Sequence, residues 1–235
     1  MKTRSKMGRN LPDNLRFAVF DCDGTLVDSQ FVIAQTMNRT FEDFDLPALE
    51  RQDIRRIIGL HLPEAIGELV GEAPSGTSFD EMAEAYKAHF FQLRESGDFF
   101  EPLYDHVKEV LKALADDNVV LGVATGKSRR VLEYILEKQG LRDLFSCLKT
   151  SDDGPGKPHP KILLDAMSEV GASPDATVVL GDTTFDICLA KNAGAGALGV
   201  DWGYHEGDEL IAAGAAKLIG SFADVPDALE ELWPS

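Results

Sequence analysis

The sequence predicts an α/β protein in which helices wind both faces of a parallel sheet and an all-helical domain is inserted after the first strand. Apolar runs of strand length alternate with helical stretches from residue 102 onward, which is the order of a doubly wound sheet. Residues 28–97 contain helical patterns and no convincing strand. Several strands end at polar side chains, and ligands of open parallel sheets lie at the carboxyl ends of the strands.

The core elements follow from the period of the apolar residues. Continuous apolar runs are typical of strands covered on both faces, whereas stripes of helical spacing indicate helices. Gly140 and Gly171 follow two of the helical stretches and are expected to cap them. We expect strands at 17–20, 119–124, 144–148, 177–181, 197–200 and 217–219, and helices at 104–115, 129–139, 160–170, 186–191, 209–213 and 225–232.

The helical block is too long for an ordinary connection, because loops in α/β units usually have about 2–6 residues besides their helix. Asp28 and Ser29 can cap a first helix, whose apolar residues recur at helical spacing as far as Phe44. Further helical stretches follow at 50–58, 63–70 and 79–93. We therefore expect a helical cap domain at 28–97, a core domain at 15–27 and 98–235, and a disordered tail at 1–14.

The charge balance excludes several classes of partner. The chain has 23 basic and 40 acidic residues, a formal net charge of -17, whereas nucleic acids and anionic membranes are bound through basic surfaces. There is no signal-like segment and no apolar run of membrane-spanning length, so we expect a cytoplasmic protein, monomeric or homodimeric. Three cysteines without Cys-x-x-Cys spacing argue against a disulfide framework and against a zinc site.

Two carboxylates, Asp21 and Asp23, directly follow the first apolar run. Side chains two residues apart in a strand point the same way, and Gly24 lets the backbone turn sharply after them. Like charges held this close need a cation, a shared proton, or both. An EF-hand loop is excluded because Leu26 and Val32 occupy its glycine and glutamate positions. A simple turn that happens to contain acids remains an alternative for this stretch alone.

Further polar groups stand at the ends of later strands or in the loops beside them. They are Thr125 with Gly126, Lys157 with Pro158, and Asp182 with Asp186. In an open parallel sheet these positions converge on one rim with the first two acids. Carboxylates form a hard oxygen site suited to Mg²⁺, a hydroxyl and backbone N–H groups can bind phosphoryl oxygens, and a lysine balances the anionic cluster. The set favours phosphoryl transfer.

These motifs closely resemble those of the haloacid dehalogenase-like hydrolase superfamily, in particular its phosphatases with a helical cap inserted after the first motif. The matching segments are Asp21-Cys22-Asp23-Gly24-Thr25-Leu26, Thr125, Lys157-Pro158, and Gly181-Asp182-Thr183-Thr184-Phe185-Asp186. The resemblance extends from Phe17 to Trp233 and implies a Rossmann-like core. Four motifs in the same order and spacing are far more specific than any one of them.

The resemblance implies a role for each motif residue. Asp21 would attack phosphorus to form an aspartyl-phosphate, and Asp23 would act as general acid and then as general base. Thr125 and the amide of Gly126 would hold the transferred phosphoryl group, which Lys157 would bridge to the nucleophile. Many relatives have Asn at the position of Gly126, so a side-chain contact is expected to be lost there. The implied ligands of Mg²⁺ are Asp21, the backbone carbonyl of Asp23, Asp182 and Asp186.

The insert is expected to cover the site and to select the leaving group. Arg55, Arg56 and His61 lie in or beside a glycine-containing loop, and a loop of this type faces the substrate in similar phosphoglycolate phosphatases. A small phosphorylated metabolite such as phosphoglycolate is therefore the expected substrate, and Lys127 is a further candidate contact for an anion. The competing interpretation gives the two arginines a solvated helix face and makes His61 an ordinary loop residue.

Other functions share part of this pattern. A β-phosphoglucomutase-like mutase, a pyrophosphatase or a nucleotidase of the same superfamily would use the same core motifs. A receiver domain of two-component signalling also gathers acids, a Thr and a Lys around Mg²⁺, but its acid pair precedes the phosphorylated Asp. The helical insert and the Gly181-Asp182-x-x-x-Asp186 motif favour an enzyme over that domain. A dehalogenase is disfavoured because it works without Mg²⁺ and would not need Asp23.

Overall fold

The computed structural model describes residues 15–95 and 101–233. Within these ranges the chain forms a six-stranded parallel sheet of order β3-β2-β1-β4-β5-β6, so the predicted doubly wound α/β fold is confirmed. The strands are β1 (Phe17–Phe20), β2 (Val120–Ala124), β3 (Cys147–Lys149), β4 (Thr177–Gly181), β5 (Gly196–Val200) and β6 (Lys217–Ile219). Phe20 at the end of β1 pairs with Val123 on one side and Leu180 on the other. The carboxyl ends of β1, β2 and β4 are therefore level.

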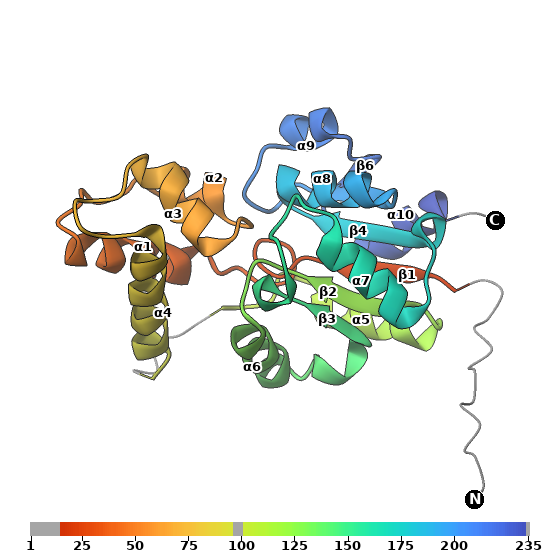
Figure 1. Cartoon of the computed structure of the whole chain (residues 1–235). Coiled ribbons are helices and arrows are strands. Elements are labelled where there is room, and N and C mark those ends of the chain that lie inside the picture. Colours follow the sequence, from red (N-terminus) through yellow and green to blue (C-terminus); the bar gives the residue numbers. More distant parts are fainter. Residues whose placement is uncertain (1–14, 96–100, 234–235) are drawn as a thin grey trace, which may run out of the picture.

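Helices cover both faces of this sheet (Figure 1). Phe17 and Val19 of β1 belong to the core under α7 (Lys161–Val170), α8 (Thr184–Ala193) and α9 (Gly207–Ala213). Ala18 and Phe20 belong to the core under α5 (Val107–Asp116), α6 (Arg129–Gln139) and α10 (Val225–Leu232). Successive residues of β1 thus point to opposite faces and all four are buried, which explains why the strand is apolar throughout.

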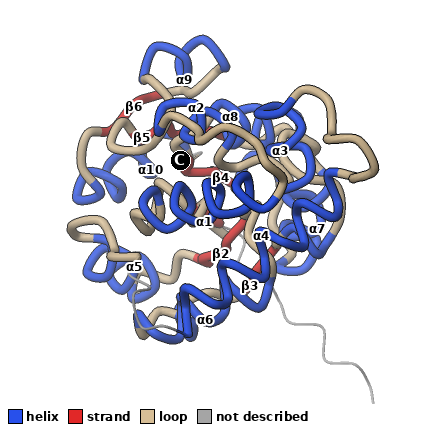
Figure 2. Tube along the Cα trace, turned by 90° about the vertical axis from the view of Figure 1, so that its left-hand side faces the viewer, coloured by secondary structure: helices blue, strands red, loops and turns tan. Residues whose placement is uncertain are grey.

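Four helices follow β1 before the chain returns to the sheet: α1 (Gln30–Asp43), α2 (Arg51–Ile57), α3 (Leu62–Val70) and α4 (Phe79–Glu95). They share a hydrophobic cluster of their own, which includes Met37, Phe41, Ile54, Ile66 and Met82. Figure 2 shows them in front of the sheet, and Figure 1 shows that they lie at the side where β1 ends. We refer to residues 28–95 as the insert. The predicted tail at 1–14 and the predicted boundary at residue 97 lie outside the described residues.

The two connections between the insert and the sheet run side by side. Val27 and Leu103 form an antiparallel bridge. The N–H of Asp28 donates to the carbonyl of Pro102 at 2.9 Å, and the N–H of Tyr104 donates to the carbonyl of Leu26 at 3.1 Å. Because both connections leave the core at one point, residues just beyond each of them can reach the end of β1.

Several element ends differ from those expected. The predicted helix at 104–115 begins at Val107, because His106 has a left-handed backbone with φ 67°. The predicted strand at 144–148 is replaced by a short 3-10 turn, Arg142–Leu144, and by β3, because only Cys147–Lys149 pairs with β2. None of the helices in residues 15–95 and 101–233 has both the length and the apolar character needed to cross a bilayer.

Candidate active site

Three buried carboxylates meet at the carboxyl ends of β1 and β4. Asp21 directly follows β1, Asp182 directly follows β4, and Asp186 lies in the first turn of α8. One oxygen of each lies within 4.8 Å of the other two. All three side chains are buried. The level strand ends thus bring together acids that are far apart in the sequence, as parallel-sheet topology leads one to expect.

Asp182 is held from several directions. The hydroxyl of Thr25 donates to one carboxylate oxygen at 2.9 Å, and the backbone N–H of Tyr204 donates to the other at 3.0 Å. Two glycines lie against the same side chain. A Cβ built on Gly24, whose φ is +78°, would lie 2.1 Å from Oδ2 of Asp182, and one built on Gly203 would lie 2.1 Å from its Cβ. Only residues without a side chain fit at these two positions.

Lys157 is the cation of the site and is fully buried. Its Nζ lies 2.7 Å from Oδ1 of Asp21 and 2.5 Å from Oδ1 of Asp186. The other oxygen of Asp186 accepts hydrogen bonds from the backbone N–H and the hydroxyl of Thr183, at 3.1 and 2.6 Å. One ammonium therefore pairs with two of the three carboxylates, so the buried cluster has more acidic than basic groups.

The donor set fits a hard divalent cation. Within the described chain, Oδ2 of Asp21 is buried and has no hydrogen-bond partner. Burial raises the pKa of Asp21 to about 7 against the opposing effect of Lys157, and Asp186 and Asp23 add to the rise. Burial, followed by the charges of Asp186 and Asp21, raises the pKa of Asp182 well above its usual value. An oxygen-coordinated Mg²⁺ would supply the missing positive charge.

Asp23 has a different set of partners from the three clustered acids. Its Oδ1 lies 2.7 Å from Nζ of Lys127 and accepts a hydrogen bond from the hydroxyl of Ser29. That hydroxyl is also 3.1 Å from the phenolic oxygen of Tyr204. The carboxylate of Asp23 thus sits beside the cluster, with its own hydrogen-bonding environment, rather than within it.

Lys127 joins Asp23 to the second connection of the insert. Its Nζ lies 3.0 Å from Oε1 of Glu101 as well as 2.7 Å from Asp23. The two carboxylates outweigh the burial of the lysine and hold the pKa of Lys127 well above its usual value. The ammonium that the sequence suggested for a substrate anion is therefore engaged with two carboxylates. Residues from both connections, Ser29 and Glu101, act on Asp23 directly or through Lys127.

The segment after β2 lies against the insert. The hydroxyl of Thr125 accepts a hydrogen bond from the N–H of Lys127 at 3.3 Å. A Cβ on Gly126 would lie 3.1 Å from the carbonyl oxygens of both Gly59 and Leu60. The insert's own backbone thus fills the space that a larger residue at position 126 would need. This close approach gives a physical reason for a glycine there.

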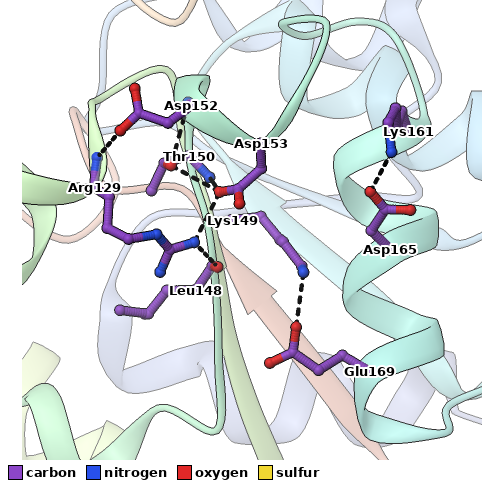
Figure 3. Close-up of polar contacts among 9 residues, drawn as sticks. All are labelled: Arg129, Leu148, Lys149, Thr150, Asp152, Asp153, Lys161, Asp165 and Glu169. Atoms are coloured by element: carbon purple, nitrogen blue, oxygen red, sulfur yellow. Dashed lines mark hydrogen bonds and ion pairs between the residues drawn. The ribbon is translucent and has the colours of Figure 1, made fainter.

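A network of polar contacts fixes the loop between β3 and Lys157 (Figure 3). The N–H and hydroxyl of Thr150 both donate to Asp153 at 2.8 Å. The guanidinium of Arg129 donates to Asp153 and to the carbonyl of Leu148, each at 2.8 Å, while its backbone N–H donates to Asp152 at 2.9 Å. The start of α6 and this loop are therefore tied together, which positions the segment that carries Lys157.

A cavity of about 390 Å³ opens beside Asp23, between the core and the insert. On the core side it is bounded by Asp23, the segment Gly126–Ser128 and the start of the loop after β3. On the insert side it is bounded by α1, by the segment Ile57–Pro63 and by α4. Asp21, Asp182 and Asp186 do not line it. The cavity therefore adjoins the acid cluster at Asp23.

Comparison with known proteins decides the family. Residues 18–200 match the model for haloacid dehalogenase-like hydrolases. The chain belongs to this family. The protein named Probable phosphatase IndB from Dickeya dadantii is 35% identical, over 91% of this chain and 93% of that protein. A phosphoglycolate phosphatase from Pasteurella multocida is 30% identical, over 90% of this chain and 96% of that protein. The crystal structure of a hydrolase from Pseudomonas syringae has a TM-score of 0.81 and 25% identity, and the match covers 94% of this chain and all of that one.

The family resemblance drawn from the four motifs is thus confirmed, and this haloacid dehalogenase-like hydrolase is an enzyme with phosphatases among its relatives. Its three predicted insert residues lie in different places. His61 lines the cavity, whereas Arg56 is exposed. Arg55 donates to the carbonyl of Gly203 at 2.6 Å and to that of Tyr204 at 3.3 Å. Arg55 therefore joins the insert to the core and does not line the cavity.

Proposed function

We propose that this protein is a Mg²⁺-dependent phosphomonoester hydrolase that works through an aspartyl-phosphate on Asp21. The observation that carries the proposal is the buried Asp21, which has one oxygen against Lys157 and the other without a partner, beside two further carboxylates. Such an arrangement supports nucleophilic attack by a carboxylate on an anionic phosphate ester, once a cation offsets the charge repulsion. The named phosphatase relatives support the same reaction class.

In the first step an oxygen of Asp21 forms a bond to phosphorus, and the bond from phosphorus to the leaving oxygen breaks. Asp23 gives its proton to that oxygen, so the alcohol leaves uncharged. Lys157, Thr125 and the amide of Gly126 bind the phosphoryl oxygens and hold them in line with Asp21. Asp21, Asp182, Asp186 and the carbonyl of Asp23 would hold Mg²⁺, which would supply positive charge next to the phosphoryl group.

In the second step water attacks phosphorus while Asp23 accepts one of its protons. The bond from phosphorus to Asp21 breaks, inorganic phosphate leaves, and both aspartates return to their starting forms. The proposed substrates are small phosphorylated metabolites, and the relative named phosphoglycolate phosphatase makes phosphoglycolate a necessary member of the test panel. Release of inorganic phosphate from a panel of phosphate esters tests this proposal, and analysis of the organic product separates a phosphatase from a phosphosugar mutase.

Addition of Mg²⁺ to metal-stripped protein is expected to raise its melting temperature. At a metal concentration about 100 times Kd the gain is about 2.7 kcal/mol, which is roughly 5–10 °C for a chain of this size. Asp182→Asn should remove most of this shift, because it deletes one proposed ligand. Glu68→Gln, an exposed acid on α3, is the control that should keep it. An equal shift in Asp182→Asn and in the parent protein would contradict the proposed metal ligands.

Asp23→Asn is expected to lower kcat about 10²- to 10⁴-fold, the range found for general acid–base catalysis. In the first step, measured as release of the alcohol in a single turnover, the loss should be largest for alkyl phosphates and much smaller for p-nitrophenyl phosphate, whose leaving group needs no proton. Asp28→Asn changes an exposed acid on the same segment and should retain parental rates. A loss of the same size for both ester types in this first step would mean that Asp23 acts by holding the fold or the metal rather than by donating a proton.

A further inference from the structure

The position of the cavity identifies the part of a substrate that it can hold. It is lined by Asp23 and by Gly126, but not by Asp21, Asp182 or Asp186. A phosphoryl group that reaches Asp21 must therefore lie beyond the inner end of the cavity, past Asp23. The part of the substrate on the other side of Asp23 then extends into the cavity. Under the proposed function Asp23 gives its proton to the leaving oxygen. The occupant of the cavity is then the leaving alcohol.

The wall that the insert contributes is largely apolar and in part aromatic. Ile57 and Ile58 are buried, and both line the cavity together with three aromatic residues of α4, Tyr86, Phe90 and Phe91. The rings of Tyr86 and Phe90 are stacked, with 6.3 Å between their centroids, and those of Phe90 and Phe91 meet edge to face, with 6.2 Å between their centroids. Such a wall favours a flat apolar body.

The volume also favours a larger body than a two-carbon acid. Pockets of about 300–1,000 Å³ accommodate ligands of drug size, and this cavity of about 390 Å³ lies in that range. Glycolate, with two carbons, would leave most of the cavity empty. Hydroxyl groups of Ser128 and Ser151, on the core side, are available at the margin for hydrogen bonds to a polar edge of the occupant.

The charged residues around the cavity are unfavourable for a second anionic group. The carboxylates that line it are those of Asp23, Asp80, Glu84 and Asp152, and its lysines are Lys87 and Lys127. Both lysines are already paired, Lys87 with Glu84 at 2.7 Å and Lys127 with Asp23 and Glu101 at 2.7 and 3.0 Å. Residues 96–100, which the structure does not describe, contain neither lysine nor arginine. A carboxylate on the leaving group would therefore meet a net negative lining.

We infer that the substrate is the phosphate monoester of an uncharged, ring-bearing alcohol, rather than of an alcohol that carries a carboxylate or a second phosphate. The inference rests on the proposed function and assigns the cavity to the ring of the leaving group. Asp23 stands between ring and phosphate, the aromatic residues of α4 cover the ring, and the net negative lining, to which Glu84 contributes, disfavours anionic competitors. Phosphoglycolate is, on this basis, a poor substrate of this enzyme.

The test compares two esters that differ by one charge. Benzyl phosphate and 4-carboxybenzyl phosphate have the same reacting bond, and kcat/KM for each is measured with Mg²⁺ present, together with phosphoglycolate. We expect benzyl phosphate to exceed both carboxylated esters at least tenfold. Glu84→Gln removes one carboxylate and leaves Lys87 without its partner. It should therefore lower the ratio of kcat/KM for benzyl phosphate to kcat/KM for 4-carboxybenzyl phosphate at least threefold. Glu68→Gln, on the insert but away from the cavity, should leave the ratio unchanged.

Equal or faster turnover of the carboxylated esters would overturn the inference. It would also be overturned if Glu84→Gln left the ratio of the two benzyl esters as it is in the parent protein. The proposed function has a separate readout, the Asp21-dependent hydrolysis of p-nitrophenyl phosphate. If that activity is present and the charge preference is absent, only the assignment of the leaving group fails. If that activity is absent, the proposed function fails and the inference fails with it.

Discussion

Replacement of Asp21 by Asn is expected to reduce phosphate release to background, a loss of roughly 10⁴-fold or more, because an amide oxygen cannot take the place of the nucleophilic carboxylate. Asn has nearly the same shape, and Lys157 keeps its 2.5 Å contact with Asp186, so the fold should be retained. Release of inorganic phosphate measures the activity, and circular dichroism with thermal melting measures the fold. A phosphorylated peptide containing Asp21, trapped by acid quenching of the parent enzyme, should be absent from the variant.

The control for this experiment is Asp165→Asn. Asp165 is a half-exposed carboxylate on α7 that pairs with Lys161 at 2.5 Å (Figure 3) and is not one of the three clustered acids. It should keep parental turnover. If Asp21→Asn retained turnover within tenfold of the parent protein, or if the trapped phosphate were found on another residue, the assignment of Asp21 as the nucleophile would be wrong.

Lys157→Met is expected to destabilise the metal-free protein by about 3–5 kcal/mol, since it removes one partner from a buried ion-pair cluster and leaves the carboxylates uncompensated. Nζ of this lysine contacts Asp21 and Asp186 and its side chain is fully buried. Turnover should be lost as well. Urea denaturation with and without Mg²⁺ measures the effect, and Mg²⁺ should restore part of the stability because it neutralises the same carboxylates.

Lys161→Met is the matched control, four residues further along the chain. Lys161 makes an i,i+4 pair with Asp165 on the surface of α7, and both side chains are more than two-fifths exposed. Pairs of this kind contribute about 0.3–0.5 kcal/mol, so the variant should unfold at nearly the parental urea concentration. Similar losses in the free energy of unfolding for the two lysine variants would show that burial does not determine how much Lys157 contributes to stability.

The residues that could be predicted from the sequence are those whose position follows from strand ends. Asp21 and Asp182 each come directly after an apolar strand, and parallel pairing of β1 with β4 places their side chains side by side. Lys157 and Asp186 were predicted from the motifs they belong to, and the structure joins them by a 2.5 Å contact. Local apolar pattern and sheet topology together are enough for Asp21 and Asp182, whereas Lys157 and Asp186 also needed the family motifs.

The environment of Asp23 could not be predicted in the same way. Ser29 is expected to cap α1, and it does stand at the N-cap position, but its hydroxyl donates to Asp23 and accepts no hydrogen bond from the N–H groups of the helix. Glu101 and Tyr204 reach the same region from the second connection and from the segment after β5. These contacts depend on where the two connections and the segment after β5 come together in the fold. No spacing along the chain indicates that they meet there, because each partner lies in a loop without periodicity.

The same limit applies to Arg55. Its place in a basic pair beside a glycine-containing loop suggested a substrate contact, yet its guanidinium donates to backbone carbonyls of residues 203 and 204. A guanidinium has several donors and satisfies them on whatever acceptors the packing of the insert brings near. The sequence indicates that such a residue is cationic and lies in the insert, but the direction of its side chain depends on tertiary packing.

The close fit around Asp182 has a consequence for cation binding. Thr25 and the N–H of Tyr204 hold its two oxygens, and the side chain lies so close to Gly24 and Gly203 that neither position has room for a Cβ. The carboxylate is therefore preorganised, and an arriving ion need not reduce its conformational entropy. The folded, ion-free protein already contains the electrostatic repulsion among the buried acids, and relief of this repulsion would contribute to the free energy of cation binding. Part of the affinity for a cation would thus be set when the chain folds.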